Sequence, residues 1–133
     1  MTQIKELLID GEFWMGTWAD NVGAPWSTRF TGVIKVKADG SFSGELKDKY
    51  GLSLINGKID WKAGKMSFEK DYVNKSQEWD EEEEQEMTVY RKKEEIKTIY
   101  YEFQRNEKLG SWNGKYNIEG SAETEPDAWC SIH

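Results

Sequence analysis

The sequence predicts an all-β fold, a single antiparallel up-and-down barrel of about eight strands. Three observations predict it. Apolar and polar residues alternate over short runs that return about every ten residues, turn signals separate these runs, and no long amphipathic helix follows to cover an open sheet. Closing the sheet on itself buries its apolar face and removes its edges. A β-sandwich is the competing architecture, and the short local turns favour the barrel.

The composition fits one domain over residues 1–133. A chain of 133 residues can bury a core of its own, and seven Trp supply bulky material for it. No run of about 18 apolar residues is present, so we expect no membrane insertion. The N-terminal stretch has no small-residue cleavage site, and the single cysteine, Cys130, has no partner for an internal disulfide. Both features lead us to expect a cytoplasmic protein, in a reducing compartment; the alternative is a mature chain from which a targeting segment has been removed.

The charge of the chain bears on its partners. The formal net charge is −7, and the Lys and Arg residues do not cluster along the sequence. A chain of this kind repels phosphate backbones and anionic lipid surfaces. We therefore expect no nucleic-acid partner.

The elements follow from the pattern in order. Residues 1–10 place Ile4, Leu7 and Leu8 at helical spacing, which predicts a short N-terminal helical segment. The clearest strand covers residues 28–38, and Asp39-Gly40 predicts a tight hairpin into the return strand at 41–47. The residues predicted to point inward are Phe30, Gly32, Ile34, Val36 and Ala38 on the first of these strands and Phe42, Gly44 and Leu46 on the second.

The second half of the chain is less regular. A turn over 48–51, a strand over 52–55 and a tight turn or bulge at Asn56-Gly57 come first. Met66, Phe68 and Tyr72 then alternate, with Lys70 at the intervening inward position. Residues 74–86 form an acidic run without apolar alternation, which predicts a solvated, mobile loop. Further strands are expected at 87–92, 98–105, 109–118 and 128–132, and Asn113-Gly114 leaves open whether 109–118 is one strand or a hairpin.

Two Gly-x-Trp triplets stand near the two ends of the chain. Gly16-Thr17-Trp18 follows the N-terminal segment, and the same spacing returns as Gly110-Ser111-Trp112. Glycine lets a neighbouring segment approach closely and tryptophan supplies a large apolar plate, so such pairs are suited to plug the end of a barrel. The opening resembles that of the calycins, the group of lipocalins, fatty-acid-binding proteins and avidins. The resemblance implies an up-and-down barrel whose cavity takes a small apolar ligand.

The chain also departs from each branch of that group. Residues 16–24 are similar to the first strand and loop of avidins, and residues 124–129 resemble the avidin segment that ends in a biotin-contacting Trp. Asp20 and Ala24 stand where avidins carry an Asn and a Ser for biotin, which argues against biotin. The last strand lacks the Arg that lipocalins pack across their first Trp, and Arg105 is the only late Arg. Residues 20–27 are too few for the two helices of fatty-acid-binding proteins.

These observations lead us to expect a non-enzymatic protein that binds a small apolar or amphipathic ligand in its barrel. Arg105, or a tyrosine hydroxyl, would orient the ligand's polar end. The alternatives are that Arg105 reaches solvent at the strand end and that the tryptophans simply fill the core. The predicted ligand-binding residues are Trp18, Phe30, Phe42, Tyr101, Arg105 and Trp112.

Other classes of function are weaker expectations. Trp14 and Tyr100 fall on outward positions, which suits a protein–protein interaction or assembly module with a filled barrel. The acidic run lacks the alternating oxygens and glycine of a calcium loop, so no metal is expected. Cys130 is interpreted as a small buried hydrophobe and His133 as a terminal residue, and the sequence carries no nucleotide or hydrolase motif. We therefore expect no catalytic residues and no cofactor.

Overall fold

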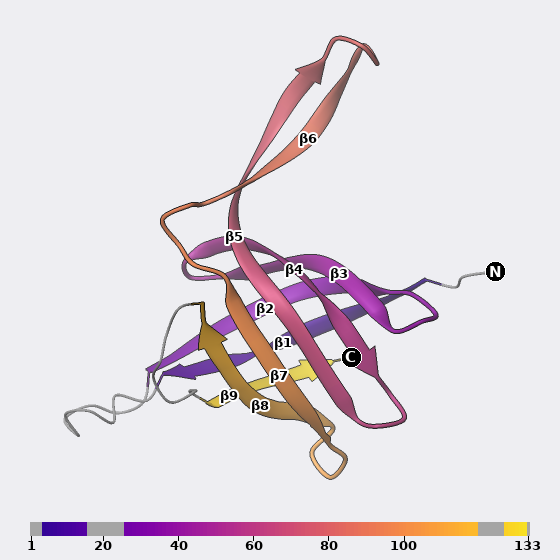
Figure 1. Cartoon of the computed structure of the whole chain (residues 1–133), viewed down its shortest axis with the longest axis vertical. Helices are drawn as coiled ribbons and strands as arrows, with labels where there is room; N and C mark the ends of the chain where they lie inside the picture. The colour runs from indigo at the N-terminus through magenta and orange to yellow at the C-terminus, as the bar shows by residue number, and fades with distance from the viewer. Residues whose placement is uncertain (1–3, 16–25, 120–126, 133) are drawn as a thin grey trace.

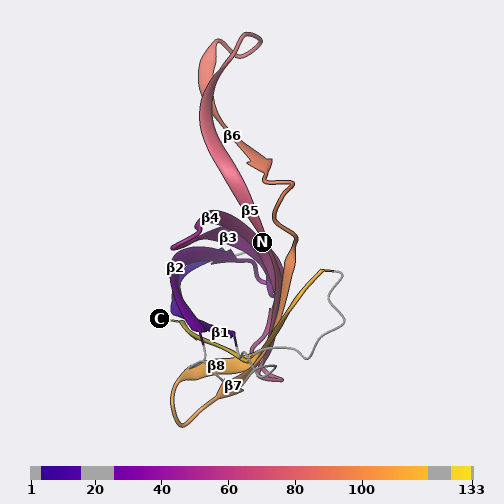
Figure 2. The same ribbon diagram turned by 90° about the vertical axis from the view of Figure 1, so that its left-hand side faces the viewer.

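The computed structural model describes residues 4–15, 26–119 and 127–132, and these residues form a closed eight-stranded antiparallel barrel with one additional strand outside it (Figures 1 and 2). The barrel order is β4-β3-β2-β1-β9-β8-β7-β5, and pairing of β4 with β5 closes it. The predicted all-β, up-and-down architecture is thus confirmed. The strands are β1 (Lys5–Met15), β2 (Trp26–Val36), β3 (Ser41–Asp48), β4 (Gly51–Asp60), β5 (Lys65–Asp80), β6 (Gln85–Lys92), β7 (Ile99–Asn106), β8 (Ser111–Ile118) and β9 (Asp127–Ile132).

The expected N-terminal helical segment is not found in the described residues. Residues 5–10 are the first part of β1, which pairs with β2 from Lys5 opposite Val36 onward. Ile4 and Leu8, two of the residues at helical spacing, are exposed. Ile9, which is not one of them, is buried in the core. The tertiary pairing with β2 therefore overrides the local spacing. Residues 1–3 lie outside the described ranges.

The prediction of a loop over the acidic run at 74–86 is wrong. β5 continues to Asp80 and β6 begins at Gln85, so that only the turn at 81–84 lies between two long strands. Cross-strand contacts hold the pair: the Gln77 amide donates to Thr88, and Arg91 forms an ion pair with Glu78. Alternation of apolar and polar residues is missing because both faces of this two-stranded ribbon are open to solvent.

Both Asn-Gly pairs lie inside strands rather than in turns. A β-carbon at Gly57 would lie 2.0 Å from the carbonyl oxygen of Ser67, and one at Gly114 would lie 1.7 Å from that of Glu102. Glycine is thus required by the close approach of the neighbouring strand. Each glycine stands opposite a large ring, Gly57 opposite Phe68 and Gly114 opposite Phe103. The turn or bulge at 56–57 is therefore corrected to a continuous β4, and β8 is a single strand.

The barrel interior follows the predicted alternation closely. Lys70 is buried at the inward position that the sequence assigns to it. Ala38, by contrast, lies beyond the end of β2 and is exposed. The buried core residues are Ile9, Phe30, Ile34, Val36, Phe42, Leu46, Ile55, Ile59, Met66, Phe68, Tyr101, Phe103, Trp112, Tyr116, Ala128 and Cys130.

The two ends of the barrel differ. The turns at 37–40, 61–64 and 107–110 lie at one end, here called the turn end. The turn at 49–50, the start of β7 and the end of β8 lie at the other, where β5 and β6 leave the barrel, here called the ribbon end (Figure 1). Within the described ranges, no helix is long and apolar enough to cross a membrane.

The close approach of strands at Gly114 makes a stability prediction. Gly114→Ala should lower the free energy of unfolding by about 3 kcal/mol or more, because the new methyl group overlaps the backbone of β7. Gly110→Ala is the control, since no atom lies within 4 Å of its β-carbon position and only its φ of 66° opposes a side chain. That variant should cost about 1 kcal/mol. Urea unfolding measures the free energy of unfolding of both variants. Equal losses would contradict the argument that the close approach of β7 excludes a side chain at Gly114.

Candidate functional site

A buried polar cluster lies inside the barrel at the ribbon end. The ammonium Nζ of Lys70 and the hydroxyl of Tyr72 both donate to Oδ2 of Asp48, each at 2.6 Å. The side chains of Lys70 and Asp48 are 0% exposed. Oδ1 of Asp48 accepts a further bond from the backbone N–H of Tyr50 at 2.8 Å. We call Asp48, Lys70 and Tyr72 the polar cluster.

Strand periodicity places these side chains. Lys70 and Tyr72 continue the inward face that Met66 and Phe68 begin on β5. Asp48 ends β3 and lies on the same face as Phe42 and Leu46. Sequence reasoning assigned Asp48 to the turn and missed it as a site residue. Extending the alternation of Phe42, Gly44 and Leu46 by one more inward step would have found it.

Burial and hydrogen bonding set the protonation of the cluster. Burial lowers the pKa of Lys70, and the carboxylate of Asp48 opposes that shift. Burial, reinforced by the hydrogen bond to Asp48, raises the pKa of Tyr72. Burial also raises the pKa of Tyr101, with a smaller contribution from Tyr72. Both tyrosine hydroxyls are protonated at neutral pH, and that of Tyr72 donates to Asp48.

An ion pair in this position is not what the core needs for stability. Removing two charges from water costs several kcal/mol per ion, and well-packed apolar residues of similar size often serve a core as well or better. Strongly shifted titratable groups at one place inside a fold are more typical of a functional site. The polar cluster is therefore the candidate site of this barrel.

An aromatic wall adjoins the polar cluster. The rings of Phe68 and Tyr101 stack at a centroid distance of 4.7 Å, and Phe103 stacks on both. Phe42 meets Phe68 edge to face at 6.0 Å, and Tyr116 tilts against Tyr101. These rings come from β3, β5, β7 and β8 and face the interior together.

The predicted site residues divide between the interior and the turn end. Phe30, Phe42, Tyr101 and Trp112 are all buried in the core. Arg105 is exposed at the end of β7, where its guanidinium lies 5.5 Å from the centre of the Trp112 ring. That place corresponds to the alternative of a strand-end arginine that reaches solvent, and it is at the opposite end of the barrel from the polar cluster. Trp18 lies outside the described residues.

Trp112 occupies the position that the second Gly-x-Trp triplet predicts for it. Its ring is fully buried near the turn end and meets Trp61 edge to face at 6.0 Å. Arg105 covers it from the solvent side. Trp61, Arg105 and Trp112 also border an open pocket of about 450 Å³ at this end. The tryptophan therefore closes the turn end, and Arg105 shields it.

Two larger open pockets lie on the outer surface. One of about 980 Å³ runs across β4, β5, β7 and β8, where Lys58, Ser67, Glu102 and Lys115 are neighbours. The other, of about 660 Å³, lies over β2, β3 and β4 beside Tyr90 of the ribbon.

Other predicted features have simple outcomes. Cys130 is fully buried, as predicted, and burial raises the pKa of its thiol. Tyr100 is exposed, whereas the side chain of Trp14 and all of His133 lie outside what the structure describes. Among the described residues, no three His, Cys, Asp or Glu side chains are placed to hold a metal ion.

Comparison with known proteins assigns the chain to no family. No protein family matches the chain, and no curated protein and no solved structure is significantly similar to it. The barrel is therefore established by the structure alone.

The buried pair makes a prediction about stability. Lys70→Met should lower the free energy of unfolding by about 3–5 kcal/mol, because it leaves the Asp48 carboxylate buried without its cation. The double variant Asp48→Leu, Lys70→Met should recover most of that loss. The control Lys35→Met removes a surface pair with Glu6, where both side chains are largely exposed, and should cost at most about 1 kcal/mol. Urea unfolding gives all three values, and a double variant no more stable than Lys70→Met would contradict the argument.

Tyr116 makes a prediction about alkaline pH. Burial raises its pKa from 10.0 to about 12. Above pH 10 the unfolded chain releases this proton while the folded chain keeps it, so the folded state loses stability as the pH rises from 10 to 12. Tyr116→Phe should make this decline less steep. Chemical unfolding at a series of pH values measures the slope, and a slope that Tyr116→Phe leaves unchanged would refute the assignment.

Proposed function

We propose that this barrel binds a small amphipathic molecule, with the apolar part among the interior rings and a polar head group at the polar cluster. The buried Asp48–Lys70–Tyr72 cluster carries the proposal. An ammonium group and a phenol hydroxyl converge there on one carboxylate, within an otherwise largely apolar interior. Apolar walls with a few placed polar groups are typical of small-molecule sites.

The chemistry of the cluster indicates the kind of head group. Lys70 and Tyr72 are hydrogen-bond donors that share one acceptor, Asp48. A head group with acceptor oxygens, such as a carboxylate or an alcohol, would compete with Asp48 for these two donors. Tyr101 lies near these groups, because Tyr72 and Asp48 contribute, after burial, to raising the pKa of its hydroxyl. It belongs to the same binding region.

The apolar part of the ligand would lie along the aromatic wall. Phe42 and Tyr101 belong to this wall, and Phe30 and Trp112 extend the apolar interior beyond it. In this proposal the protein is a calycin-like binding protein of the cytoplasm and not an enzyme. The Gly16-Thr17-Trp18 opening and the up-and-down strand order support the calycin-like part of this proposal. Arg105, at the turn end, would shield Trp112 rather than orient the ligand.

Native mass spectrometry of the gently purified protein, followed by denaturing extraction, tests for a bound molecule. We expect a stoichiometric amphipathic molecule, and we expect members of a panel of fatty acids, matched fatty alcohols and retinoids to raise the melting temperature. A ligand present at about 100 times its Kd adds about 2.7 kcal/mol to the stability. Asp48→Leu, Lys70→Met should bind the same ligand at least about tenfold more weakly, because the head group loses the ammonium donor of Lys70.

Lys35→Met is the control, since it makes the same lysine substitution on the outer surface and should leave the affinity unchanged. A bare protein that no member of the panel stabilises would overturn the proposal. Binding that the double variant retains in full would place the ligand elsewhere.

A further inference from the structure

The ribbon formed by the outer part of β5 and by β6 projects well beyond the barrel (Figures 1 and 2). Residues from Val73 to Asp80 pair with residues from Lys92 back to Gln85. The pairings of β5 with the barrel strands β4 and β7 end at Tyr72 and Lys70. Beyond its base, the two strands of the ribbon therefore have only each other among the described residues.

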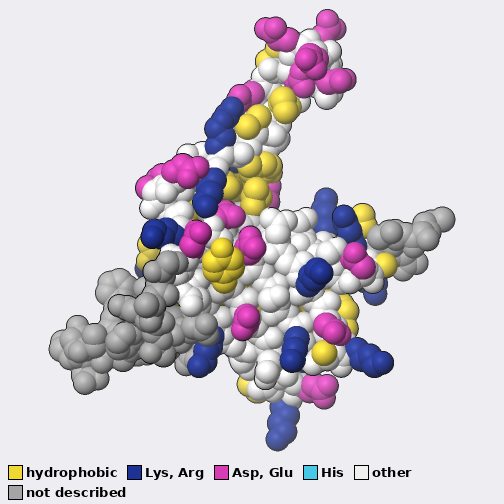
Figure 3. All heavy atoms as spheres, in the orientation of Figure 1, with side chains coloured by type: hydrophobic (Ala, Val, Ile, Leu, Met, Phe, Trp, Pro, Cys, Tyr) yellow, Lys and Arg dark blue, Asp and Glu magenta, His cyan; other side chains and the backbone are white. Residues whose placement is uncertain are grey.

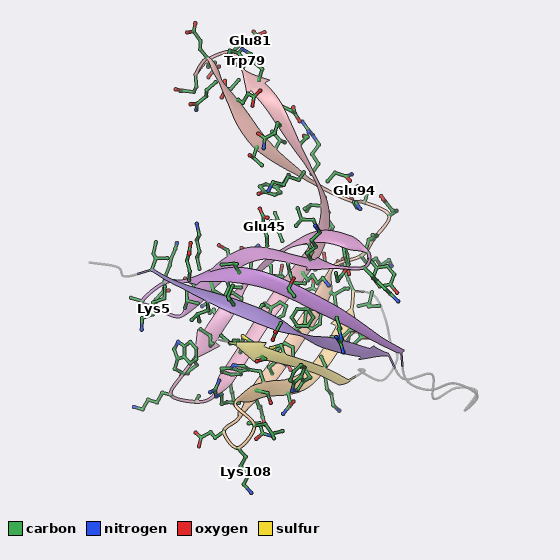
Figure 4. All side chains as sticks on the ribbon, turned by 180° about the vertical axis from the view of Figure 1, so that it is seen from behind. Lys5, Glu45, Trp79, Glu81, Glu94 and Lys108 are labelled. Atoms are coloured by element: carbon green, nitrogen blue, oxygen red, sulfur yellow. The ribbon has the colours of Figure 1, made fainter. Side chains whose placement is uncertain are left out.

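The ribbon is fixed at its base. On one side, Lys92 lies 3.5 Å from the Asp71 carboxylate and donates to Thr98 at 3.1 Å. On the other, the Tyr90 hydroxyl donates to Glu45 of β3, and Lys75 lies 3.5 Å from the same carboxylate. Figure 4 shows Glu45 on the barrel below the ribbon. These contacts, which join the ribbon to β3 and to the segment before β7, set its direction relative to the barrel.

Large apolar side chains stand exposed along this ribbon. Trp79 is 62% exposed and Met87 is 41% exposed. The register places them on opposite faces, because Trp79 is opposite Glu86 and Met87 is opposite Glu78. A two-stranded ribbon has no core of its own and is marginally stable in water. Exposed Trp and Met side chains therefore add little to its stability while no partner covers them. Exposed aromatic residues of this kind are typical of protein-binding surfaces.

The charge at the tip selects the partner. Acidic side chains gather at the far end of the ribbon (Figure 3), where Figure 4 labels Trp79 and Glu81. Within the described ranges these acids form no ion pair, while Arg91, the nearest cation on β6, is bound to Glu78. Nucleic acids, anionic membranes and a second copy of this tip are all repelled by such charge. The acidic residues are Asp80, Glu81, Glu82, Glu83, Glu84 and Glu86.

We propose that the ribbon is a docking arm for a basic, extended segment of another protein with apolar side chains at alternate positions. The segment adds a strand along an open edge of the ribbon, where backbone N–H and C=O groups are available. Its apolar side chains cover Trp79, the more exposed of the two, and its Lys and Arg residues meet the acidic tip. This inference is independent of ligand binding in the barrel, which uses the interior.

Titration of the isotope-labelled protein with synthetic peptides, followed by amide NMR, tests the proposal. The probe is a peptide of about twelve residues that alternates Lys and Val, long enough to span the eight residues of β6. Matched peptides replace Val by Ser, or Lys by Glu. We expect the Lys–Val peptide to shift amides of residues 74–92. The Lys–Ser peptide should bind at least about tenfold more weakly, and the Glu–Val peptide should not bind.

Variants locate the contact. Trp79→Ser, and separately Gln in place of Glu81, Glu82, Glu83 and Glu84, should each weaken Lys–Val binding about tenfold. Trp61→Ser is the matched control, because Trp61 is a similarly exposed tryptophan at the turn end of the barrel. It should leave the affinity unchanged.

Three outcomes would overturn the proposal. The first is the absence of shifts in the ribbon. The second is equal binding of the Lys–Val and Lys–Ser peptides with no effect of Trp79→Ser, which would mean charge attraction alone. The third is ribbon shifts that depend on protein concentration without peptide, which would make a second copy the occupant.

Discussion

Pairing of β4 with β5 closes the barrel, and the other features of the structure depend on this closure. Without it, the sheet would expose two edges and an apolar face that no helix covers. The two strands approach so closely at Gly57 that any side chain there would meet the backbone of β5. The ring of Phe68 stands opposite this glycine. The closure of the barrel, the glycine at position 57 and the aromatic wall therefore depend on one another.

β5 also joins the interior site to the ribbon. Its first part, from Lys65 to Tyr72, completes the barrel and turns Lys70 inward. Asp71, between Lys70 and Tyr72, points the other way and binds Lys92 and Thr98 at the base of the ribbon. Successive residues therefore serve opposite faces of one strand, as the two-residue period requires. The polar cluster and the ribbon base are held by the same short segment.

Sequence reasoning succeeded where one face of a strand is buried. Phe30, Ile34 and Val36 were found because burial enforces alternation, and Lys70 was placed inward by the same rule even though it is charged. The rule fails where neither face of a strand is buried. The ribbon is open to solvent on both faces, so residues 74–86 show no apolar period and the sequence predicts a loop where β5 ends and β6 begins. The first strand was taken for a helix because the exposed Ile4 and Leu8 happen to lie at helical spacing.

Two other errors have a common cause in local signals that carry two meanings. Asn-Gly is a strong turn signal, yet at Gly57 and Gly114 the glycine is there for the close approach of a neighbouring strand. Asp48 is at once the last inward residue of β3 and, through its bond to the Tyr50 N–H, the residue that begins a turn. The turn role is visible in sequence, but the inward role depends on Lys70, which is distant along the chain. Only the closed barrel brings the two together.

The two candidate functional regions are the places where this chain departs from what a stable barrel requires. A core gains nothing from a fully buried Lys–Asp pair that apolar residues could replace, and a solvated ribbon gains nothing from an exposed tryptophan. Elsewhere, alternation, glycine placement and aromatic packing all agree with the fold, which is what a consistent sequence looks like. Among the described residues, the polar cluster and the ribbon are the departures on which the two proposals rest. Barrel stability does not account for either one, whereas the two proposals, a polar head group bound inside and a basic segment bound outside, account for both.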